Sequence, residues 1–577
     1  MVRWELKDIM DKDSVESMMS EIDNKTKDLE GWREKLSSGI DEKDFLEIIR
    51  LQEELTNLTS RLGAFATLWQ SESTGDSERN SFMLKVSEFL TDVSNRLIFF
   101  DIWFKNLDDT NAKRLIDSAE RYRYMLDSIR KLKPYTLEEE NEKILSIKDL
   151  TGSEALTNIY DIITNRFSWH FEDKELTQEE MTQYYRDSDP VLRKRAYEAV
   201  LSRYGDEEAV LGEIYKNICN DWRNENIKIR GFSSPLNVRN ISNDVPDAAV
   251  DSLLASIREN SELMKEYFRL KFKALGIQDP SRTDLYAPRN GHDEEYTFEQ
   301  AKDIVLDTYK RFSTKMYEEA RRIFDDGHVH SEIDKGKRSG AFCYSVQNDV
   351  VPYVLLNFTG RRNDVFTLMH EIGHGIHGLL GSKQSRFTFH STLPLAETAS
   401  IFGETLLARR MISESDDERK LDLLMENLDK HYASIIRQGY FVEFEKEAHE
   451  LVEKGSTIDE LNNRYMENLR EQFDGVMEVP EYFKHEWKYI PHIYHTPFYC
   501  YAYSFGNLLV LSLMKKYEDE GEAFIPKLLK ILEYGGSASP VQILNEAGFD
   551  ITRKDFWEGG FQLIREELEE LQRLLEG

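Results

Sequence analysis

Two histidines and a glutamate within residues 366–377 have the types and the spacing of a metal-dependent hydrolytic site. His370 and His374 are four residues apart, so on a helix they lie one turn apart on one face. Their Cβ atoms are then about 5–6 Å apart, and two imidazoles can bind one metal ion, for which zinc is the best match. Glu371 projects roughly 100° round the helix, too far to be a ligand but within reach of a metal-bound water. The motif predicts a zinc site with Glu371 as general base.

The residues that flank this motif favour a buried helix. An H-E-x-x-H pattern occurs by chance in many soluble proteins, and a helix with two solvated histidines is the simplest alternative. Here Leu368, Met369 and Ile372 make the flanks apolar, which is typical of a helix inside the protein. We therefore interpret the motif as a metal site.

A catalytic zinc needs a third protein ligand and leaves a further position for water. His377 lies on the same helix face, but it is about 10.5 Å along the axis from His370, whereas zinc–ligand bonds are only about 2 Å long. One straight helix therefore does not supply all three ligands. The longer motif H-E-x-x-H-x-x-G-x-x-H is also excluded, because the chain has His377 and Leu380 where that motif needs glycine and histidine.

Two glutamates in the next predicted helix, which begins after Pro394, are the best candidates to complete the site. Glu397 and Glu404 are seven residues apart and so share a face, and the residues between them are mostly small or apolar. Two carboxylates that face inward need a cation. We predict that Glu397 is the third ligand and that Glu404 accepts a hydrogen bond from a ligand imidazole and fixes its tautomer. Two solvated glutamates are the alternative.

A third polar group lies at residues 491–503, where two histidines and four tyrosines occur in one short segment. This density exceeds what packing requires. Phenols and imidazoles are neutral donors that can stabilise a developing oxyanion beside zinc. The segment is therefore predicted to complete the site of a hydrolase.

Composition indicates a large soluble protein. The 577 residues are too many for one core, so two or three subdomains are expected. Apolar residues are 40% and charged residues 32% of the chain, which favours a mainly helical globular fold. The net charge of −32, from 75 basic and 107 acidic residues, argues against nucleic acid or an anionic membrane as partner.

The same composition predicts a cytoplasmic location. There is no signal-like start after Met1, and apolar runs are far too short to span a membrane. The three cysteines are odd in number and widely spaced, which is typical of free thiols in a reducing compartment. None has the C-x-x-C spacing of a zinc site, so thiolates are not expected to hold the metal.

Apolar spacing and capping signals divide the chain into three predicted parts: an N-terminal helical domain at 1–115, a helical subdomain at 116–205 and a catalytic domain at 206–577. Thr136, Thr177 and Asp189 are predicted to cap helices. The N-terminal part carries no candidate chemistry, so we interpret it as a wall over the cleft that restricts access to flexible peptides.

The catalytic part is predicted to contain a small sheet beside the metal helix. A helix is expected from about residue 248 to 276 and another from Thr297 to about 327. Two short β-like runs at 339–345 and 353–359 follow, directly before the metal helix. The exposed edge of such a sheet can pair with an extended peptide through backbone hydrogen bonds.

Taken together, these residues resemble the oligoendopeptidase F branch of the thimet oligopeptidase-like zinc metallopeptidases. The segments that carry the resemblance are residues 230–232, 284–288, 337–343, 370–375, 396–400, 491–501 and 535–537. The resemblance implies a mainly helical, zincin-type, clam-like molecule with a deep channel, which cuts short unstructured peptides in the cytosol. It also implies Glu397 as a zinc ligand and His492, Tyr494 and Tyr501 as substrate or transition-state contacts; His495 has no clear counterpart.

The sequence therefore predicts a zinc endopeptidase with one zinc per chain, bound by His370, His374 and Glu397. Glu371 would take the proton of the attacking water and deliver it to the leaving amine, while Tyr501, with His492 or Tyr494, would stabilise the oxyanion.

Two other functions are compatible with the zinc motif. A metallocarboxypeptidase would need a basic residue to hold the substrate C-terminus, and product lengths would distinguish it. The other alternative is a peptide-binding scaffold with a structural zinc. Glu371 argues against the scaffold, because a closed structural site does not need that carboxylate.

Overall fold

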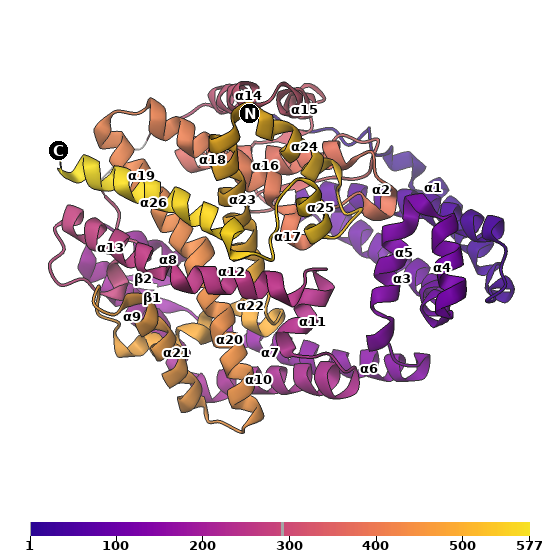
Figure 1. Ribbon diagram of the computed structural model, residues 1–577, viewed down its shortest axis with the longest axis horizontal. Helices are drawn as coiled ribbons and strands as arrows, with labels where there is room; N and C mark the ends of the chain where they lie inside the picture. The colour runs from indigo at the N-terminus through magenta and orange to yellow at the C-terminus, as the bar shows by residue number, and fades with distance from the viewer. Residues whose placement is uncertain (1, 290–293, 577) are drawn as a thin grey trace. The chain divides into compact units, whose positions relative to one another are not determined.

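The computed structural model describes residues 2–289 and 294–576, and these are mainly helical (Figure 1). Helices make up 74% of the chain and the strands form only small sheets, so the predicted mainly α fold is confirmed. Among the described residues, no helix combines the length and the apolar character that crossing a membrane requires.

The chain folds into two compact units, each built from three separate segments. Unit 1 consists of Met1–Pro134, Asp293–Leu407 and Tyr517–Gly548, and unit 2 consists of Tyr135–His292, Ala408–Lys516 and Phe549–Gly577. The N-terminal helices and the metal-site segment therefore belong to the same unit, although the whole first segment of unit 2 separates them in the sequence. The predicted domain boundaries at residues 115 and 205 divide the chain into contiguous segments, which is a different kind of division. These boundaries stay a prediction.

Unit 1 contains an N-terminal helical bundle and the helices around the metal site. In the bundle, Phe45 stacks on Phe100 and Phe104 at centroid distances of 6.3 and 5.8 Å, which closes a buried aromatic core between the long helices. The helices of this unit are α1 (Val15–Glu30), α2 (Glu42–Ser71), α3 (Ser77–Asn106), α4 (Asp109–Ser118), α5 (Arg123–Lys131), α14 (Phe298–Phe312), α15 (Thr314–Asp325), α16 (Arg362–Gly381), α17 (Leu393–Ala396), most of α18 (Thr398–Glu414), α24 (Ile525–Glu533) and α25 (Pro540–Glu546).

A three-stranded sheet precedes α16 in the chain; two of its strands fall within the predicted runs 339–345 and 353–359, and the third was not predicted. The central strand β5 (Tyr353–Leu355) pairs in parallel with β3 (Val329–His330) and antiparallel with β4 (Phe342–Tyr344). Lys337 holds the sheet together, because its Nζ donates to the carbonyls of His330, Glu332 and Leu356 at 3.1, 2.5 and 2.9 Å. The order β3-β5-β4 makes β4 an edge strand of the described sheet.

The N-terminal bundle packs against this sheet. Trp4 contacts His330, Phe342 and Tyr353 at centroid distances of 5.2, 6.3 and 5.7 Å. Tyr353 and Leu355 of the central strand are fully buried and belong to the same apolar core as the bundle helices. The bundle is thus part of the support for the strands that precede the metal helix.

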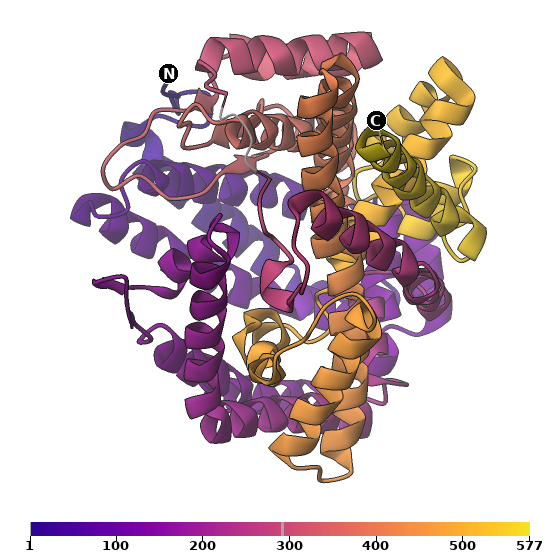
Figure 2. The same ribbon diagram turned by 90° about the vertical axis from the view of Figure 1, so that its left-hand side faces the viewer.

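Unit 2 is helical apart from one hairpin, β1 (Trp169–Phe171) with β2 (Lys174–Leu176). Its helices α20 (Arg437–Glu453) and α21 (Ile458–Phe473) run antiparallel and are joined by a short turn (Figure 2). Its other helices are α6 (Glu139–Thr151), α7 (Ser153–Thr164), α8 (Gln178–Gln183), α9 (Pro190–Asp206), α10 (Glu208–Trp222), α11 (Pro235–Ser242), α12 (Asp247–Glu259), α13 (Ser261–Leu275), α19 (Asp417–His431), α22 (Pro491–His495), most of α23 (Tyr501–Glu520) and α26 (Lys554–Glu576).

Most of the predicted helix caps are present. Thr177 and Thr297 form capping boxes, and Asp189 accepts a hydrogen bond from the Val191 backbone N–H ahead of α9. The predicted cap at Thr136 is wrong, because α6 begins only at residue 139 with Glu138 as its N-cap.

Two long predicted helices are each divided in the structure. The helix expected at 248–276 is interrupted at Asn260, and Gly276 then ends α13 in the left-handed conformation, with φ of 70°. The helix expected from Thr297 to 327 is interrupted at Ser313, which is extended (φ −152°, ψ 122°) and caps α15 with its side chain. Apolar periodicity continues across both breaks, so it did not reveal them.

Candidate metal centre

Helix α16 carries the H-E-x-x-H motif, and its start is firmly anchored. The Asp364 carboxylate accepts hydrogen bonds from the Thr359 N–H and hydroxyl at 2.7 and 2.6 Å and from the Arg361 N–H at 3.1 Å. A carboxylate in the first turn also interacts favourably with the helix dipole. These contacts fix the helix directly after β5 and so fix where its histidines lie.

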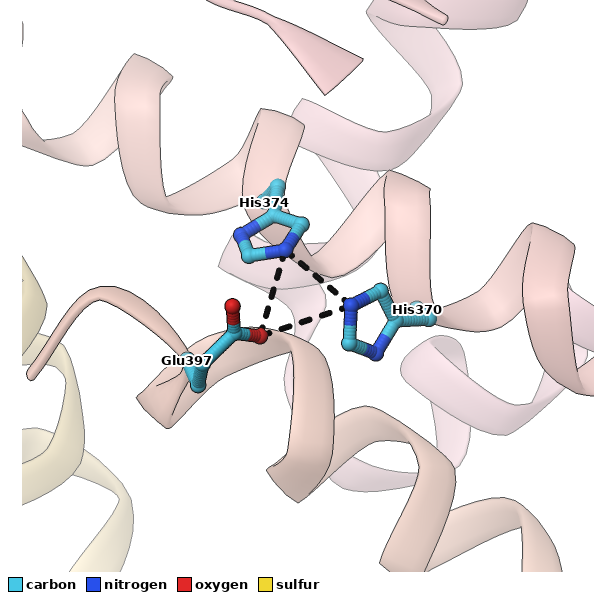
Figure 3. Close-up of side chains that lie close together, drawn as sticks. All are labelled: His370, His374 and Glu397. Carbon is cyan, nitrogen blue, oxygen red and sulfur yellow. Dashed lines mark hydrogen bonds and ion pairs between the residues drawn. The ribbon is translucent and has the colours of Figure 1, made fainter. Parts of the chain in front are cut away.

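The structure brings His370, His374 and Glu397 together, with their ligand atoms directed at one point (Figure 3). The two Nε2 atoms are 3.1 Å apart, and Glu397 Oε2 lies 3.4 Å from Nε2 of His370 and 3.3 Å from Nε2 of His374. Zinc bonds of about 2.0–2.2 Å at tetrahedral angles place neighbouring ligand atoms about 3.3–3.5 Å apart. Two imidazoles and one carboxylate in this arrangement fit a zinc ion.

Glu404 contacts His370, the first of the predicted ligands, as the sequence analysis expected. Its Oε1 accepts a hydrogen bond from Nδ1 of His370 at 2.6 Å. The ring is thereby held in the tautomer that leaves the Nε2 lone pair free toward the other ligands. Burial lowers the pKa of His370, but the hydrogen bond to Glu404 and the charges of Glu404, Glu397 and Glu371 together outweigh burial, so the pKa is raised.

Glu397 reaches the site from a helix break rather than from within one helix. It ends the short helix α17, with φ −89° and ψ 0°, and α18 begins at the next residue. The Ser400 hydroxyl donates to Glu397 Oε2 at 2.8 Å and orients the carboxylate. Burial raises the pKa of Glu397, but the imidazoles of His374 and His370 outweigh burial and lower it to about 2. The carboxylate is therefore ionised, as a metal ligand must be.

Because Gly373 has no side chain, the backbone of α18 can lie directly against the backbone of α16. A Cβ atom built there would lie 2.5 Å from the Ser400 Cα and 2.8 Å from the Ala399 carbonyl oxygen. Both distances are shorter than a van der Waals contact. The backbones of α16 and α18 thus touch between the two histidine ligands, and Ser400 holds Glu397 from the same point of contact.

Glu371 lies beside the ligands but is not one of the three clustered groups. It is only 6% exposed. Burial raises its pKa, and the neighbouring His370 and His374 offset only part of this effect. The raised pKa makes this buried carboxylate a stronger proton acceptor than an exposed glutamate.

His377 is directed elsewhere. It is buried and hydrogen-bonds to the backbone of Ala396, the residue before Glu397, and burial lowers its pKa to about 4. It therefore steadies the segment that presents Glu397. Sequence reasoning missed this role and those of Ser400 and Gly373, since the only signal was the small size of Gly373 and Ser400.

The predicted oxyanion donors lie in unit 2, and two of them are buried there. Tyr494 stacks on Tyr160 with ring centroids 4.0 Å apart, and its hydroxyl donates to the Leu211 carbonyl at 3.3 Å. The Tyr501 hydroxyl accepts a hydrogen bond from Asn243 Nδ2 at 2.6 Å. Both phenols are thus engaged inside unit 2.

The other polar groups of the 491–503 segment are more accessible. His492 is half-buried, with Nε2 3.1 Å from the Tyr503 hydroxyl, and it stacks on Tyr499 at 5.9 Å between centroids. His495 is exposed and pairs with Asp161 at 2.8 Å. The structure therefore groups His492 with Tyr499 and Tyr503, two residues that the sequence analysis had not singled out individually.

Comparison with known families identifies the chain. Residues 183–563 match the family model described as Peptidase family M3, and residues 103–168 match the one described as Oligopeptidase F. The chain belongs to peptidase family M3. The predicted relation to oligoendopeptidase F is confirmed, and the chain is a metalloendopeptidase whose family implies a bound metal.

Curated relatives and solved structures extend over most of the chain. The chain is 30% identical to the chromosomal oligoendopeptidase F of Lactococcus lactis subsp. cremoris, over 67% of this chain and 64% of the relative. It is 25% identical to the oligopeptidase PepF of Bacillus subtilis, over 99% of this chain and 87% of the relative. The crystal structure of oligoendopeptidase-F from Enterococcus faecium shares the fold, with a TM-score of 0.71 at 22% identity, and covers 97% of this chain and 98% of that one.

The contact at Gly373 predicts that even a methyl group disturbs the metal centre. Gly373→Ala has to separate α16 from α18, and the obstacle is backbone, so overpacking should cost at least the usual 1–3 kcal/mol or so. We expect a lower thermal unfolding midpoint and a loss of bound metal, measured by calorimetry and metal analysis. Gly63→Ala in α2 is the control, because its Cβ would meet only Leu90 at 3.4 Å. Normal metal content in Gly373→Ala would contradict this account.

The two glutamates are predicted to differ in their effect on metal affinity. Glu404→Ala removes a partner of one ligand and should weaken binding by about 10–100-fold. Glu397→Ala removes a ligand and should weaken it far more. Competition titration against a chelator measures both, and the reverse order would exchange the two roles.

Proposed function

We propose that this chain is a zinc-dependent endopeptidase that hydrolyses internal bonds of short, unstructured oligopeptides. The observation that carries the proposal is the triangle of His370, His374 and Glu397 donor atoms, with sides of 3.1, 3.4 and 3.3 Å. Two nitrogens and one carboxylate oxygen form a catalytic zinc set, with a position left for water.

We propose one zinc per chain. Within the described ranges, one other group of possible ligand atoms is close enough to bind a metal, and it consists of Asp149, Asp221 and Glu225. Three carboxylates without nitrogen or sulfur are not a typical zinc set. The histidine-containing group is therefore the zinc site.

We propose a role for each group around this site. Zinc, when bound, supplies Lewis acidity and lowers the pKa of water. Glu404 keeps the His370 Nδ1 proton in place. Glu371 accepts a proton from the attacking water and delivers it to the leaving amine, and burial supports this role because it raises the proton affinity of the carboxylate.

His492, Tyr494 and Tyr501 remain proposed contacts of the substrate or of the oxyanion. They differ in which existing hydrogen bonds each side chain has to give up before it can contact a substrate. Tyr494 and Tyr501 are buried and would have to exchange the hydrogen bonds that they make with the Leu211 carbonyl and Asn243. His492 is half-buried and only has to release Tyr503. We propose His492 as the donor that reaches a substrate most directly.

The proposal of flexible peptides as substrates is based on the edge strand β4, which adjoins the metal helix. An extended peptide can pair with such an edge through its backbone, whereas a folded chain cannot present an extended segment. The N-terminal bundle packs on the same sheet, which supports its proposed role in restricting access. Cys219, Cys343 and Cys500 are all free thiols, which supports a cytoplasmic location.

The base assignment predicts that Glu371→Gln separates metal binding from catalysis. Glutamine keeps the shape but cannot take a proton, so activity should fall by about 10²–10⁴-fold or more while about one zinc per chain is retained. Metal analysis and peptide hydrolysis measure the two properties, and removal of zinc by a chelator should abolish the wild-type activity. Loss of metal in Glu371→Gln would mean that Glu371 is a ligand.

The restriction to flexible peptides predicts a strong dependence on substrate structure. Activity should be high on a ten-residue peptide and negligible on a stable folded domain, with a long disordered protein as the informative intermediate. Product analysis by mass spectrometry, with and without chelator, measures all three. Equal rates on the three substrates would show that the site is open to solvent, even if the zinc chemistry is right.

A further inference from the structure

A cavity of about 1090 Å³ lies inside unit 1 next to the sheet. Its walls come from α2, α3 and α5 of the N-terminal bundle, from β4 and from the segment 386–390. This volume is slightly above the range of about 300–1,000 Å³ for small-molecule sites. The cavity can therefore hold part of a peptide but not a folded chain.

The strand β4 connects this cavity with the metal helix. Cys343 lines the cavity, and a Cβ atom on Gly375, the residue after His374, would lie 3.7 Å from its sulfur. A peptide that pairs with β4 near the metal centre would therefore run beside the cavity. Side chains that line the cavity are in a position to select such a peptide.

Among these side chains, Arg386 has hydrogen-bonding capacity that the protein does not use. Its Nη2 donates to the Ser60 hydroxyl at 2.6 Å. Its Nε and Nη1 are buried and have no hydrogen-bond partner in the described parts of the chain. Leaving buried donors unsatisfied is unfavourable, and more so when they carry a charge.

No carboxylate of the described residues neutralises this guanidinium. The Glu53 carboxylate is nearby, but it accepts the Arg386 backbone N–H at 2.9 Å and the Tyr122 hydroxyl at 2.6 Å. Asp101 lines the same cavity but forms no ion pair with Arg386. The closest compensation is the face of Phe389, with its ring centroid 5.5 Å from the guanidinium carbon.

We propose that Arg386 determines specificity by binding a carboxylate of the peptide in this cavity. The planar guanidinium matches a carboxylate, which can accept two parallel hydrogen bonds from Nη2 together with either Nε or Nη1, and Nε and Nη1 are the donors that have no partner among the described residues. This inference rests on the proposed function, since it names the chemistry that the same site selects. The carboxylate comes either from the peptide C-terminus or from an aspartate or glutamate side chain.

The two sources have different consequences. A terminal carboxylate would fix the distance between the cleaved bond and the C-terminus, so that C-terminal products would have a constant length. An acidic side chain would instead fix a residue preference at one position and leave the product length free. In either case the enzyme requires flexible peptides of suitable charge, despite its own strong negative charge.

The test compares matched peptides on the wild type, Arg386→Gln and Arg386→Lys. One pair of peptides differs only in a free or amidated C-terminus, and a second set replaces each internal glutamate by glutamine in turn. The wild type should prefer the carboxylate form about 10–100-fold in kcat/KM, the range for a hydrogen bond to a charged group. Arg386→Gln should lose this preference through a higher KM for the carboxylate peptides. Arg386→Lys, which keeps the charge without the planar fork, should be intermediate.

A matched control excludes a general effect of charge. Arg114→Gln removes an arginine of α4 that pairs with Glu42 at 3.3 Å and does not line the cavity, and it should keep the wild-type preference. If only amidation of the C-terminus lowers kcat/KM on the wild type, the carboxylate comes from the C-terminus. If only one replacement of glutamate by glutamine lowers it, the carboxylate comes from that side chain. Equal wild-type cleavage of charged and neutral peptides would overturn the inference, as would an equal loss on all peptides in Arg386→Gln.

Calorimetric binding separates this inference from the proposed function. The same peptides are titrated into Glu371→Gln, with and without the additional change Arg386→Gln. Stronger binding of the carboxylate peptide that disappears with Arg386 supports the inference even if the chain cleaves nothing. Efficient zinc-dependent cleavage combined with binding that ignores the carboxylate would leave the proposed function intact and overturn the inference.

Discussion

The close approach of two helix backbones is the constraint on which the metal centre depends. At Gly373 there is no room for a side chain against Ser400 and Ala399, so α16 and α18 meet within the turn that carries both histidines. This contact brings the Glu397 carboxylate close to the imidazoles of His370 and His374. The distances between them are about those that separate neighbouring ligand atoms around one metal ion. A partly buried group of donors at such distances fits a bound cation, and the contacts of Glu404 and Ser400 orient His370 and Glu397.

The second constraint is the sheet that precedes α16. Its strands are very short, with two or three residues each, and strands of this length are not stable alone. They are held on one side by the metal helix and on another by the N-terminal bundle, whose apolar core includes Tyr353 and Leu355. A bundle without any catalytic group is therefore part of the catalytic unit, because it supports the strand that leads into the metal helix.

The unused donors of Arg386 are best understood within this arrangement. The bundle, the edge strand and the segment after α16 line an open cavity beside the sheet, and Arg386 in its wall has no counter-charge among the described residues. Natural proteins pair buried charges, so an unpaired guanidinium next to a peptide-binding edge indicates a partner supplied by the substrate. A carboxypeptidase would need a basic residue of this kind, but an endopeptidase can use it equally well to position a peptide.

The sequence by itself predicted the class of fold and the class of enzyme, and it pointed to the residues of the proposed metal site. The spacing of His370, Glu371 and His374 fixes their geometry because a helix turn is rigid, and capping signals such as those at Thr177 and Thr297 act within three residues. These local rules gave the metal helix, the two longer strands of its sheet and the helical character of the rest. Glu397 was also identified, but for an incomplete reason, since it lies at a helix break and not on a continuous helix face.

Only the tertiary structure decided which distant segments share a unit. Periodicity records that a face is buried but not what buries it, so the pairing of the N-terminal bundle with the 293–407 segment was invisible in the sequence. The same reason explains the missed roles of Ser400, His377 and Gly373, which act through contacts with another segment. It also explains Arg386, because an arginine in a sequence shows its charge, and only the fold shows that its Nε and Nη1 have no partner among the described residues.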